Sequence, residues 1–271
     1  MVKCGIVQAS SVSDIRDNTE KIRRYVEAAK EKGCKVLCFP EAFLTSYTPK
    51  MVEKLSVSVE NEYIKQISRV TMEYEMDLLV GFMEKDFWEK KYYLTHGIFR
   101  GDGSSVFYRK THLGQREQEV FTAGDELSVF ELSCGLKVGI QLCMETHFPE
   151  ITQTLSQRGA EVVFAPHAVP RVAGSRSTIW SKIIPARSYD NRVYMACCNL
   201  WDEVKFGGGC LVTDPAGEVL ASCYEDQEAL VCFEVDREKV RSYHEGNGSM
   251  KKRYYPEMRR VELYYKEGKS E

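Results

Sequence analysis

The chain has 271 residues, of which 43% are hydrophobic and 28% are charged, and its formal net charge is −3. That length supports a full hydrophobic core, while the balanced charge excludes a basic stripe for nucleic acid and a polybasic patch for membranes. No apolar run approaches the ~20 residues that cross a bilayer, and the start, MVKCGIVQAS, lacks the pattern of a secretory leader.

The ten cysteines mostly lie inside apolar, strand-like runs. In a chain with no leader pattern, this usage indicates reduced, buried thiols and a cytoplasmic protein. The five histidines show no close metal-ligand spacing, and no C-x-x-C motif occurs. We therefore expect no metal site.

The first half of the chain alternates short apolar runs with segments of helical periodicity. Residues 14–32 place Ile22, Val26 and Ala29 on one helix face, and the run KVLCF that follows fits a strand covered on both faces. Loops are expected at 42–56 and 110–124. The expected helices are 14–32 and 60–74, and the expected strands are 3–9, 35–39, 78–83, 92–99, 105–108, 127–132 and 136–142.

The second half repeats this alternation, which predicts one α/β domain over residues 1–271 with no linker inside it. The sequence DPAG at 214–217 is a turn signal between two strands. Residues 236–271 are charged and tyrosine-rich, so we expect an arm that lies on the surface or across a subunit boundary. The expected helices are 149–158 and 176–191, and the expected strands are 161–165, 193–198, 210–213, 218–222 and 229–235.

Cys143 stands at the corner between a predicted strand and a predicted helix. Val138, Ile140 and Leu142 alternate with more polar or small residues, and Pro149 opens the helical pattern. A thiol at such a corner lies near backbone N–H groups and the positive end of a helix dipole, and both favour the thiolate. The alternative is a buried cysteine that merely ends a strand.

Two more polar residues follow predicted strands, where α/β sheets usually place function. Glu41 comes directly after VLCFP, and Lys110 ends FYRK. Either could instead be a solvated charge at a strand end. With Cys143 they share one chemical logic, since a glutamate can deprotonate a thiol and an ammonium can stabilise an oxyanion. Such a trio performs acyl transfer through a thioester with water as the final acceptor, although spacing alone does not bring the three together.

Several blocks of the chain resemble the nitrilase superfamily of carbon–nitrogen hydrolases, in the family's order and spacing. They are KCGIVQAS, VLCFPEAF, FYRKTHLG and GIQLCMETHFPE, followed by AEVVFAPHA, PARSYDNRVYMACCN, TDPAGEVL and the tail RRVELYY. The resemblance covers nearly the whole chain. It implies a four-layer α-β-β-α sandwich, built as a homodimer in which higher oligomers are common.

The same resemblance implies a role for each of four residues. Glu41 is the expected general base, Lys110 the group that stabilises the oxyanion, and Cys143 the nucleophile. The family pattern E-x-x-x-F-x-x-G matches EQEVFTAG, which begins at Glu117. Glu117 is therefore expected to hold the lysine and the substrate nitrogen in position, and Glu119 is the less favoured choice.

The residues near the nucleophile leave the substrate open. Members that hydrolyse N-carbamoyl amino acids or α-keto ω-amides often carry an arginine four residues after the cysteine, where this chain has His147. Arg171 or Arg176 could supply that grip on a carboxylate. Trp180 begins a W-S-K sequence similar to carbamoyl-polyamine hydrolases, although a tryptophan on a helix face more often packs in the core. The candidate substrate contacts are Met144, His147, Tyr47, Arg171 and Trp180.

We therefore expect a cytoplasmic, cofactor-free amidohydrolase that cleaves a small amide or N-carbamoyl amine through a thioester and releases ammonia or amine. C-M-E-T around the nucleophile looks more like the amidase and carbamoylase branches than the C-W-E of true nitrilases, but a nitrilase that forms acid and ammonia stays open. Two further alternatives are a non-catalytic regulatory or binding protein and a redox sensor that uses Cys143 or the Cys197-Cys198 pair. No nucleic acid or membrane partner is expected.

Overall fold

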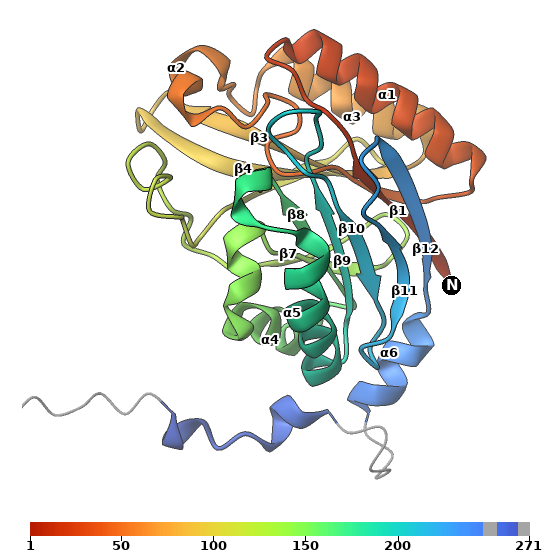
Figure 1. Cartoon of the computed structure of the whole chain (residues 1–271). Coiled ribbons are helices and arrows are strands. Elements are labelled where there is room, and N and C mark those ends of the chain that lie inside the picture. Colours follow the sequence, from red (N-terminus) through yellow and green to blue (C-terminus); the bar gives the residue numbers. More distant parts are fainter. Residues whose placement is uncertain (246–253, 265–271) are drawn as a thin grey trace, which may run out of the picture.

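The computed structural model describes residues 1–245 and 254–264 and arranges them in four layers. Two six-stranded sheets stack face to face. Helices α1 (Ile15–Glu31) and α3 (Glu62–Tyr74) cover one sheet, while α4 (Pro149–Gln157) and α5 (Arg176–Asn191) cover the other (Figure 1). This is the α-β-β-α sandwich that the sequence predicts.

The first sheet has the strand order β12-β1-β2-β3-β4-β5. Its three central strands, β1, β2 and β3, are parallel, and the strands on either side pair antiparallel with their neighbours. Crossover helices α1 and α3 connect the parallel strands on one face of the sheet. The strands are β1 (Val2–Gln8), β2 (Val36–Cys38), β3 (Asp77–Asp86), β4 (Lys91–Phe99), β5 (Ser105–Arg109) and β12 (Ala229–Val235).

The second sheet, with the order β11-β10-β9-β8-β7-β6, repeats this plan. β7, β8 and β9 are parallel and are connected through α4 and α5, and the flanking strands are antiparallel. The strands are β6 (Val129–Glu131), β7 (Lys137–Ile140), β8 (Val162–His167), β9 (Tyr194–Asn199), β10 (Cys210–Thr213) and β11 (Val219–Cys223).

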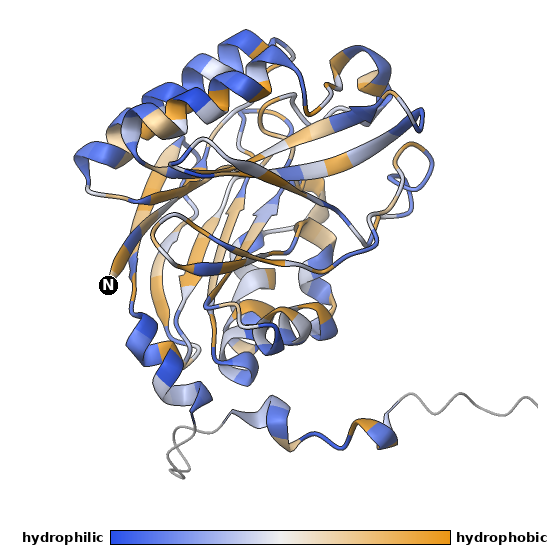
Figure 2. Ribbon diagram, turned by 180° about the vertical axis from the view of Figure 1, so that it is seen from behind, coloured by the Kyte–Doolittle hydropathy of each residue, from blue (hydrophilic) through white to orange (hydrophobic). Residues whose placement is uncertain are grey.

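Three apolar layers hold the sandwich together. Ile6 and Leu79 from the first sheet meet Ile140 and Phe164 from the second, and all four side chains are fully buried. A second layer lies between the first sheet and the stripes of α1 and α3, and a third lies between the second sheet and α4 and α5. Figure 2 shows the corresponding hydrophobic colouring along the strands. Because burying a large aliphatic or aromatic side chain stabilises a fold by ~1.5–3 kcal/mol, these layers dominate its stability.

Most elements lie within a few residues of their expected positions, and the differences near the strand ends matter for the site. The strand expected to reach residue 142 ends at Ile140, and a 3₁₀ turn, Cys143–His147, precedes α4. β3 extends to Asp86 because β4 pairs with its whole outer half. The loop expected at 42–56 contains a short helix, α2 (Val52–Leu55).

The C-terminal part begins with α6 (Arg237–His244), whose Val240 is buried in the layer between the sheets. Beyond it, Tyr254 stacks on His244, and its hydroxyl lies 2.7 Å from Ser156 Oγ. Residues 246–253 and 265–271 of the expected arm lie outside the described residues. Each helix within 1–245 and 254–264 is too short or too polar to cross a membrane.

Candidate active site

Three of the four predicted catalytic side chains meet at one ammonium group. Lys110, directly after β5, places Nζ 2.8 Å from Glu41 Oε1 and 2.9 Å from Glu117 Oε1. Lys110 and Glu41 are each 1% exposed and Glu117 is 7% exposed, whereas Glu119 lies on the surface. Since buried charges need charge partners, this arrangement explains how three ionisable side chains share one dry site.

Two close backbone approaches position these side chains. A Cβ on Gly81, in β3, would lie 2.4 Å from the backbone N of Ala42, which follows Glu41. A Cβ on Gly124 would lie 2.3 Å from the carbonyl oxygen of the residue before Lys110. Both separations are too short for any side chain, so glycine is required at each position for close backbone packing beside a catalytic residue.

Glu117 is held by three donors. Besides the lysine ammonium, Tyr47 OH donates to Oε1 at 2.7 Å, and the backbone N–H of Gly114 donates to Oε2 at 2.7 Å. Burial, followed by the Glu41 and Glu117 carboxylates, raises the pKa of Tyr47, so its hydroxyl remains a donor. Tyr47, expected as a substrate contact, thus holds Glu117 in position.

Cys143 approaches this group from the second sheet. It opens the 3₁₀ turn with a φ of 48°, in the left-handed region that non-glycine residues rarely adopt. Glu41, Lys110, Glu117 and the backbone N–H of Ala168, which follows β8, all act on the thiol electrostatically. Strained backbone of this kind often marks a functional position.

The position of Cys143 at a strand-to-helix corner suggested a lowered pKa, but the pKa of this thiol is raised. Burial, followed by the neighbouring Glu41 carboxyl, raises the pKa to about 12, and Lys110 and the Ala168 N–H offset this only in part. The loss of hydration outweighs the corner's dipoles. The resting group is therefore a thiol, and it needs a base to become a nucleophile.

Glu41 has the properties of that base. Burial raises its pKa to about 7, although Lys110 opposes the shift. Its Oε1 accepts from Lys110, while Oε2 is buried and has no hydrogen-bond partner among the described residues. Burial lowers the pKa of Lys110, but Glu41, Cys143 and Glu117 raise it more, so the lysine stays an ammonium. A carboxyl that titrates near neutrality beside a permanent cation is suited to proton transfer.

Glu145, which the sequence analysis assigned no role, joins the two halves of the site. Its fully buried carboxylate accepts from the backbone N–H of Leu142 at 2.6 Å, on the cysteine side. On the lysine side it accepts from Tyr108 OH at 2.8 Å, Thr111 N at 2.8 Å and Thr111 Oγ1 at 2.7 Å. Lys110 lies between Tyr108 and Thr111 in the sequence. The sequence signal for this role was a glutamate two residues beyond the nucleophile, soon after a buried strand.

Met144 and His147 lie on the same turn in different surroundings. Met144 is half-buried, and its sulfur is 3.8 Å from where a Cβ on Gly114 would lie, beside the Glu117 loop. His147 is exposed, and partial desolvation together with Arg176 and Arg187 lowers its pKa. A neutral imidazole cannot replace the charge of the arginine that the resemblance leads one to expect there.

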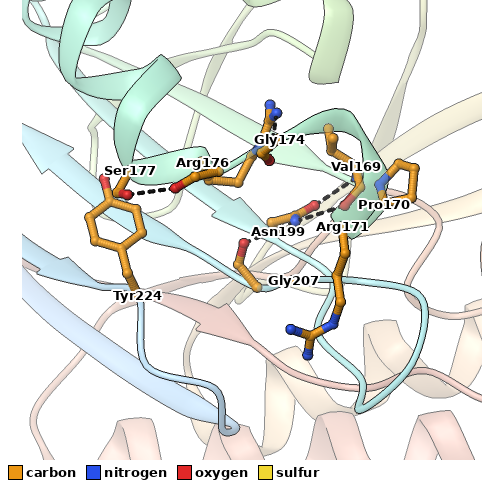
Figure 3. Close-up of a pocket in the computed structure, with 11 residues that line it drawn as sticks. Val169, Pro170, Arg171, Gly174, Arg176, Ser177, Asn199, Gly207 and Tyr224 are labelled. Atoms are coloured by element: carbon orange, nitrogen blue, oxygen red, sulfur yellow. Dashed lines mark hydrogen bonds between the residues drawn. The ribbon is translucent and has the colours of Figure 1, made fainter.

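Arg171 and Trp180 are occupied by contacts within the protein. Arg171 donates to Asp226 at 2.5 Å and to the carbonyl oxygen of Asp202 at 2.7 Å. Its side chain points away from Arg176 (Figure 3). Trp180 is fully buried, and its ring lies 4.9 Å from that of His167, in the apolar layer under α5. Arg171 is therefore an ion-pair partner and Trp180 is part of the core, and a contact of either side chain with the substrate stays a prediction.

The arrangement supplies a thiol, a base and an oxyanion-stabilising cation at one place, which is the equipment for acyl transfer. Among the described residues, no group of three or more His, Cys, Asp or Glu side chains is arranged to hold a metal ion.

Comparison with known proteins shows that this chain is similar to carbon–nitrogen hydrolases. The profile of the carbon–nitrogen hydrolase family matches residues 3–245. The human omega-amidase NIT2 is 28% identical over 249 residues, covering 86% of this chain and 87% of that protein. A probable nitrilase of Schizosaccharomyces pombe is 24% identical over 96% of this chain and 95% of its own length.

Solved structures share the fold. Saccharomyces cerevisiae Nit3, a member of branch 10 of the nitrilase superfamily, superposes with a TM-score of 0.82 at 25% identity, covering 92% of this chain and 95% of that one. An amidase from Nesterenkonia sp. also has a TM-score of 0.82, at 21% identity, covering 97% of this chain and 94% of that one. The four-layer sandwich is common to all three chains.

Proposed function

Because this chain belongs to the carbon–nitrogen hydrolase family and is a hydrolase of non-peptide C–N bonds, we propose that it cleaves a small amide or N-carbamoyl amine through a thioester on Cys143. The observation that carries the proposal is the unpartnered Oε2 of Glu41. It belongs to a carboxyl with a pKa of about 7, and it acts on a thiol whose own pKa is about 12.

In the first step, Glu41 takes the thiol proton while Cys143 Sγ attacks the substrate carbonyl. The oxyanion that forms is stabilised by the Lys110 ammonium and by the backbone N–H of Met144, in the first turn of the 3₁₀ segment, where N–H groups lack partners within the turn. Glu117 holds the lysine in place for this contact. Because the thiol is neutral at rest, proton transfer accompanies the attack.

The intermediate collapses when Glu41 returns the proton to the leaving nitrogen, which departs as ammonia or an amine. The same carboxylate then deprotonates a water molecule that attacks the thioester, and Cys143 leaves as a thiol. One water is consumed for each C–N bond broken. A related glutamate-to-leucine variant of the Nesterenkonia amidase carries the acetamide moiety of fluoroacetamide covalently on its active-site cysteine, which supports a cysteine nucleophile in this fold.

The test is ammonia release from a panel of amides, ureido compounds and nitriles by the wild-type protein and by Cys143→Ala. We expect turnover of an amide or ureido compound, a thioester adduct detectable by mass spectrometry, and loss of activity in the variant with an unchanged melting temperature. Hydrolysis that persists in Cys143→Ala contradicts the mechanism. Turnover of a nitrile in preference to its cognate amide identifies a nitrilase instead.

The homodimer and the cytoplasmic location stay predictions. Sedimentation of the purified chain tests the first, and fractionation of the cells that express it tests the second.

A further inference from the structure

Thr146 carries a buried hydroxyl beside the nucleophile that the proposed chemistry leaves unused. The residue is fully buried, and its Oγ1 donates to the carbonyl oxygen of Cys143 at 2.7 Å. The same hydroxyl lies 3.5 Å from Nε2 of His167, a distance at which a hydrogen bond is weak. Because an unsatisfied buried hydroxyl is costly, the Cys143 carbonyl is the acceptor on which this side chain depends.

His167 leaves that hydrogen bond undisturbed. Its Nδ1 lies 2.8 Å from the carbonyl oxygen of Ala165, which assigns the ring proton to Nδ1 and makes Nε2 an acceptor. Burial lowers the pKa of His167 to about 3, so the imidazole is neutral at physiological pH. The hydroxyl proton of Thr146 therefore has two acceptors within reach, and the Cys143 carbonyl is the nearer one.

The carbonyl of Cys143 belongs to the same peptide group as the N–H of Met144. This peptide is trans and planar, so its C=O and N–H bonds point in opposite directions. A donor that holds the carbonyl oxygen on one side therefore fixes the direction of the N–H on the other. Among the described residues, the Met144 N–H donates to no other group, so it is available for the oxyanion of the proposed reaction.

This peptide group lies in a part of the backbone that needs restraint. Cys143 has a φ of 48°, and a non-glycine residue in the left-handed region persists only where its surroundings hold it there. The Thr146 hydroxyl is one of those restraints. It also polarises the peptide group, because hydrogen bonds in a chain strengthen one another, and this makes the N–H a better donor.

We propose that Thr146 is a positioning residue for the oxyanion site, whose hydroxyl fixes and polarises the Cys143–Met144 peptide so that the Met144 N–H faces the oxyanion. This rests on the proposed function for the reaction in which the oxyanion forms. Thr146 itself touches neither the substrate nor the reacting atoms. Its loss should therefore be felt in the transition state, where the oxyanion develops, and not in the binding of the uncharged amide.

The kinetic test is hydrolysis of butyramide by Thr146→Val, which keeps the branched shape of the side chain and removes the hydroxyl. kcat and kcat/KM should fall together by roughly three- to tenfold, the range for one neutral hydrogen bond, with KM unchanged. Thr146→Ser restores the hydroxyl and should keep kcat within about twofold of wild type. A loss that appears only in KM contradicts the proposal.

Thr71→Val is the matched control. Thr71 is also fully buried, and its Oγ1 also donates at 2.7 Å to the carbonyl oxygen three residues earlier, that of Ser68. It lies in α3, which covers the outer face of the first sheet (Figure 1). Thr71→Val should therefore lower the melting temperature about as much as Thr146→Val and leave kcat unchanged. Equal losses of kcat in the two valine variants show a general effect of destabilisation and overturn the proposal.

Two reactions of Cys143 separate the oxyanion from the thiol. Iodoacetamide alkylates the sulfur by displacement of iodide from a saturated carbon, so no oxyanion forms, and the rate should be equal in Thr146→Val and wild type. With butyraldehyde, a C–S bond forms, the carbonyl electron pair moves onto oxygen, and Glu41 takes the thiol proton. The affinity for butyraldehyde, measured as protection of Cys143 from iodoacetamide, should be roughly three- to tenfold weaker in Thr146→Val.

The aldehyde also separates this proposal from the proposed reaction, because it requires no turnover. If wild-type protein cleaves no amide but butyraldehyde protects it better than Thr146→Val, the amidase proposal fails and the positioning role stands. Equal protection of both proteins, no protection of the wild type, or alkylation slowed as much as kcat overturns the positioning role. Thr146→Ala, which also lacks the hydroxyl, replaces Thr146→Val if that variant fails to fold, and wild-type kcat in Thr146→Ala overturns the role too.

Discussion

Replacing Glu145 by glutamine tests whether this carboxylate couples the two halves of the active site. Oε2 accepts from the Leu142 N–H and Oε1 accepts from Thr111, while Tyr108 OH lies within 2.9 Å of both oxygens. Glutamine removes the charge and replaces one acceptor by an NH₂ group. That group would face an N–H donor in a fully buried place, so at least one hydrogen bond becomes a clash between donors.

The expected cost follows from the number of bonds. Hydrogen bonds to charged groups contribute ~1.5–3 kcal/mol and neutral ones ~0.5–1.5 kcal/mol, while an unsatisfied buried donor costs ~1–3 kcal/mol. At the lower ends of these ranges, loss of charge from three remaining bonds and one unsatisfied donor together cost about 4 kcal/mol. That is a large share of the ~5–15 kcal/mol typical of a folded domain.

Urea denaturation followed by circular dichroism measures the loss of stability, and ammonia release measures the loss of activity. Because Lys110 lies between Tyr108 and Thr111, displacement of that segment should lower kcat/KM by about a hundredfold, the effect of misplacing a catalytic group by ~1 Å. Glu119→Gln, on the exposed part of the Glu117 loop, is the control. A loss of stability below about 1 kcal/mol with activity retained would refute the coupling role.

Two further predictions concern the base and the backbone. Glu41 must be ionised to accept the thiol proton and has a pKa of about 7, so kcat/KM should fall about tenfold for each pH unit below 7. The rate of alkylation of Cys143 by iodoacetamide should continue to increase well above pH 9. A fall in kcat/KM that begins only near pH 4–5, or an alkylation rate that levels off near pH 7, contradicts these assignments. Gly124→Ala should destabilise the protein by ~1–3 kcal/mol and lower kcat, since its Cβ would lie 2.3 Å from the carbonyl before Lys110; a melting temperature and a kcat equal to wild type would show that the two segments can separate freely.

The chain's periodicity was sufficient to predict an α/β fold. Alternating apolar spacing in β1 and helical spacing in α1 predicted the order of elements and a single α/β domain. The stacking of two sheets into a four-layer sandwich was implied by the resemblance to the nitrilase superfamily. The bounds of α5, Arg176–Asn191, match the helix expected at 176–191.

Glu41, Lys110 and Cys143 were singled out because each lies at the end of a predicted strand, and the resemblance added Glu117. What the sequence could not supply was their environment. The pKa of Cys143 depends on how completely folding removes water from the thiol and on which carboxyl lies beside it. From its local position at a strand end, the pKa of Cys143 was predicted to be lowered, whereas burial raises it.

Partners distant in the sequence were likewise decided by the tertiary structure. Arg171 and Arg176 lie five residues apart in the sequence, yet Arg171 is paired with Asp226 and Arg176 is buried with no acidic partner among the described residues. Glu145 binds donors from a strand more than thirty residues away. Local pattern determines which residues become helix, strand and core, but the charge state and partner of a polar side chain depend on the long-range packing that surrounds it.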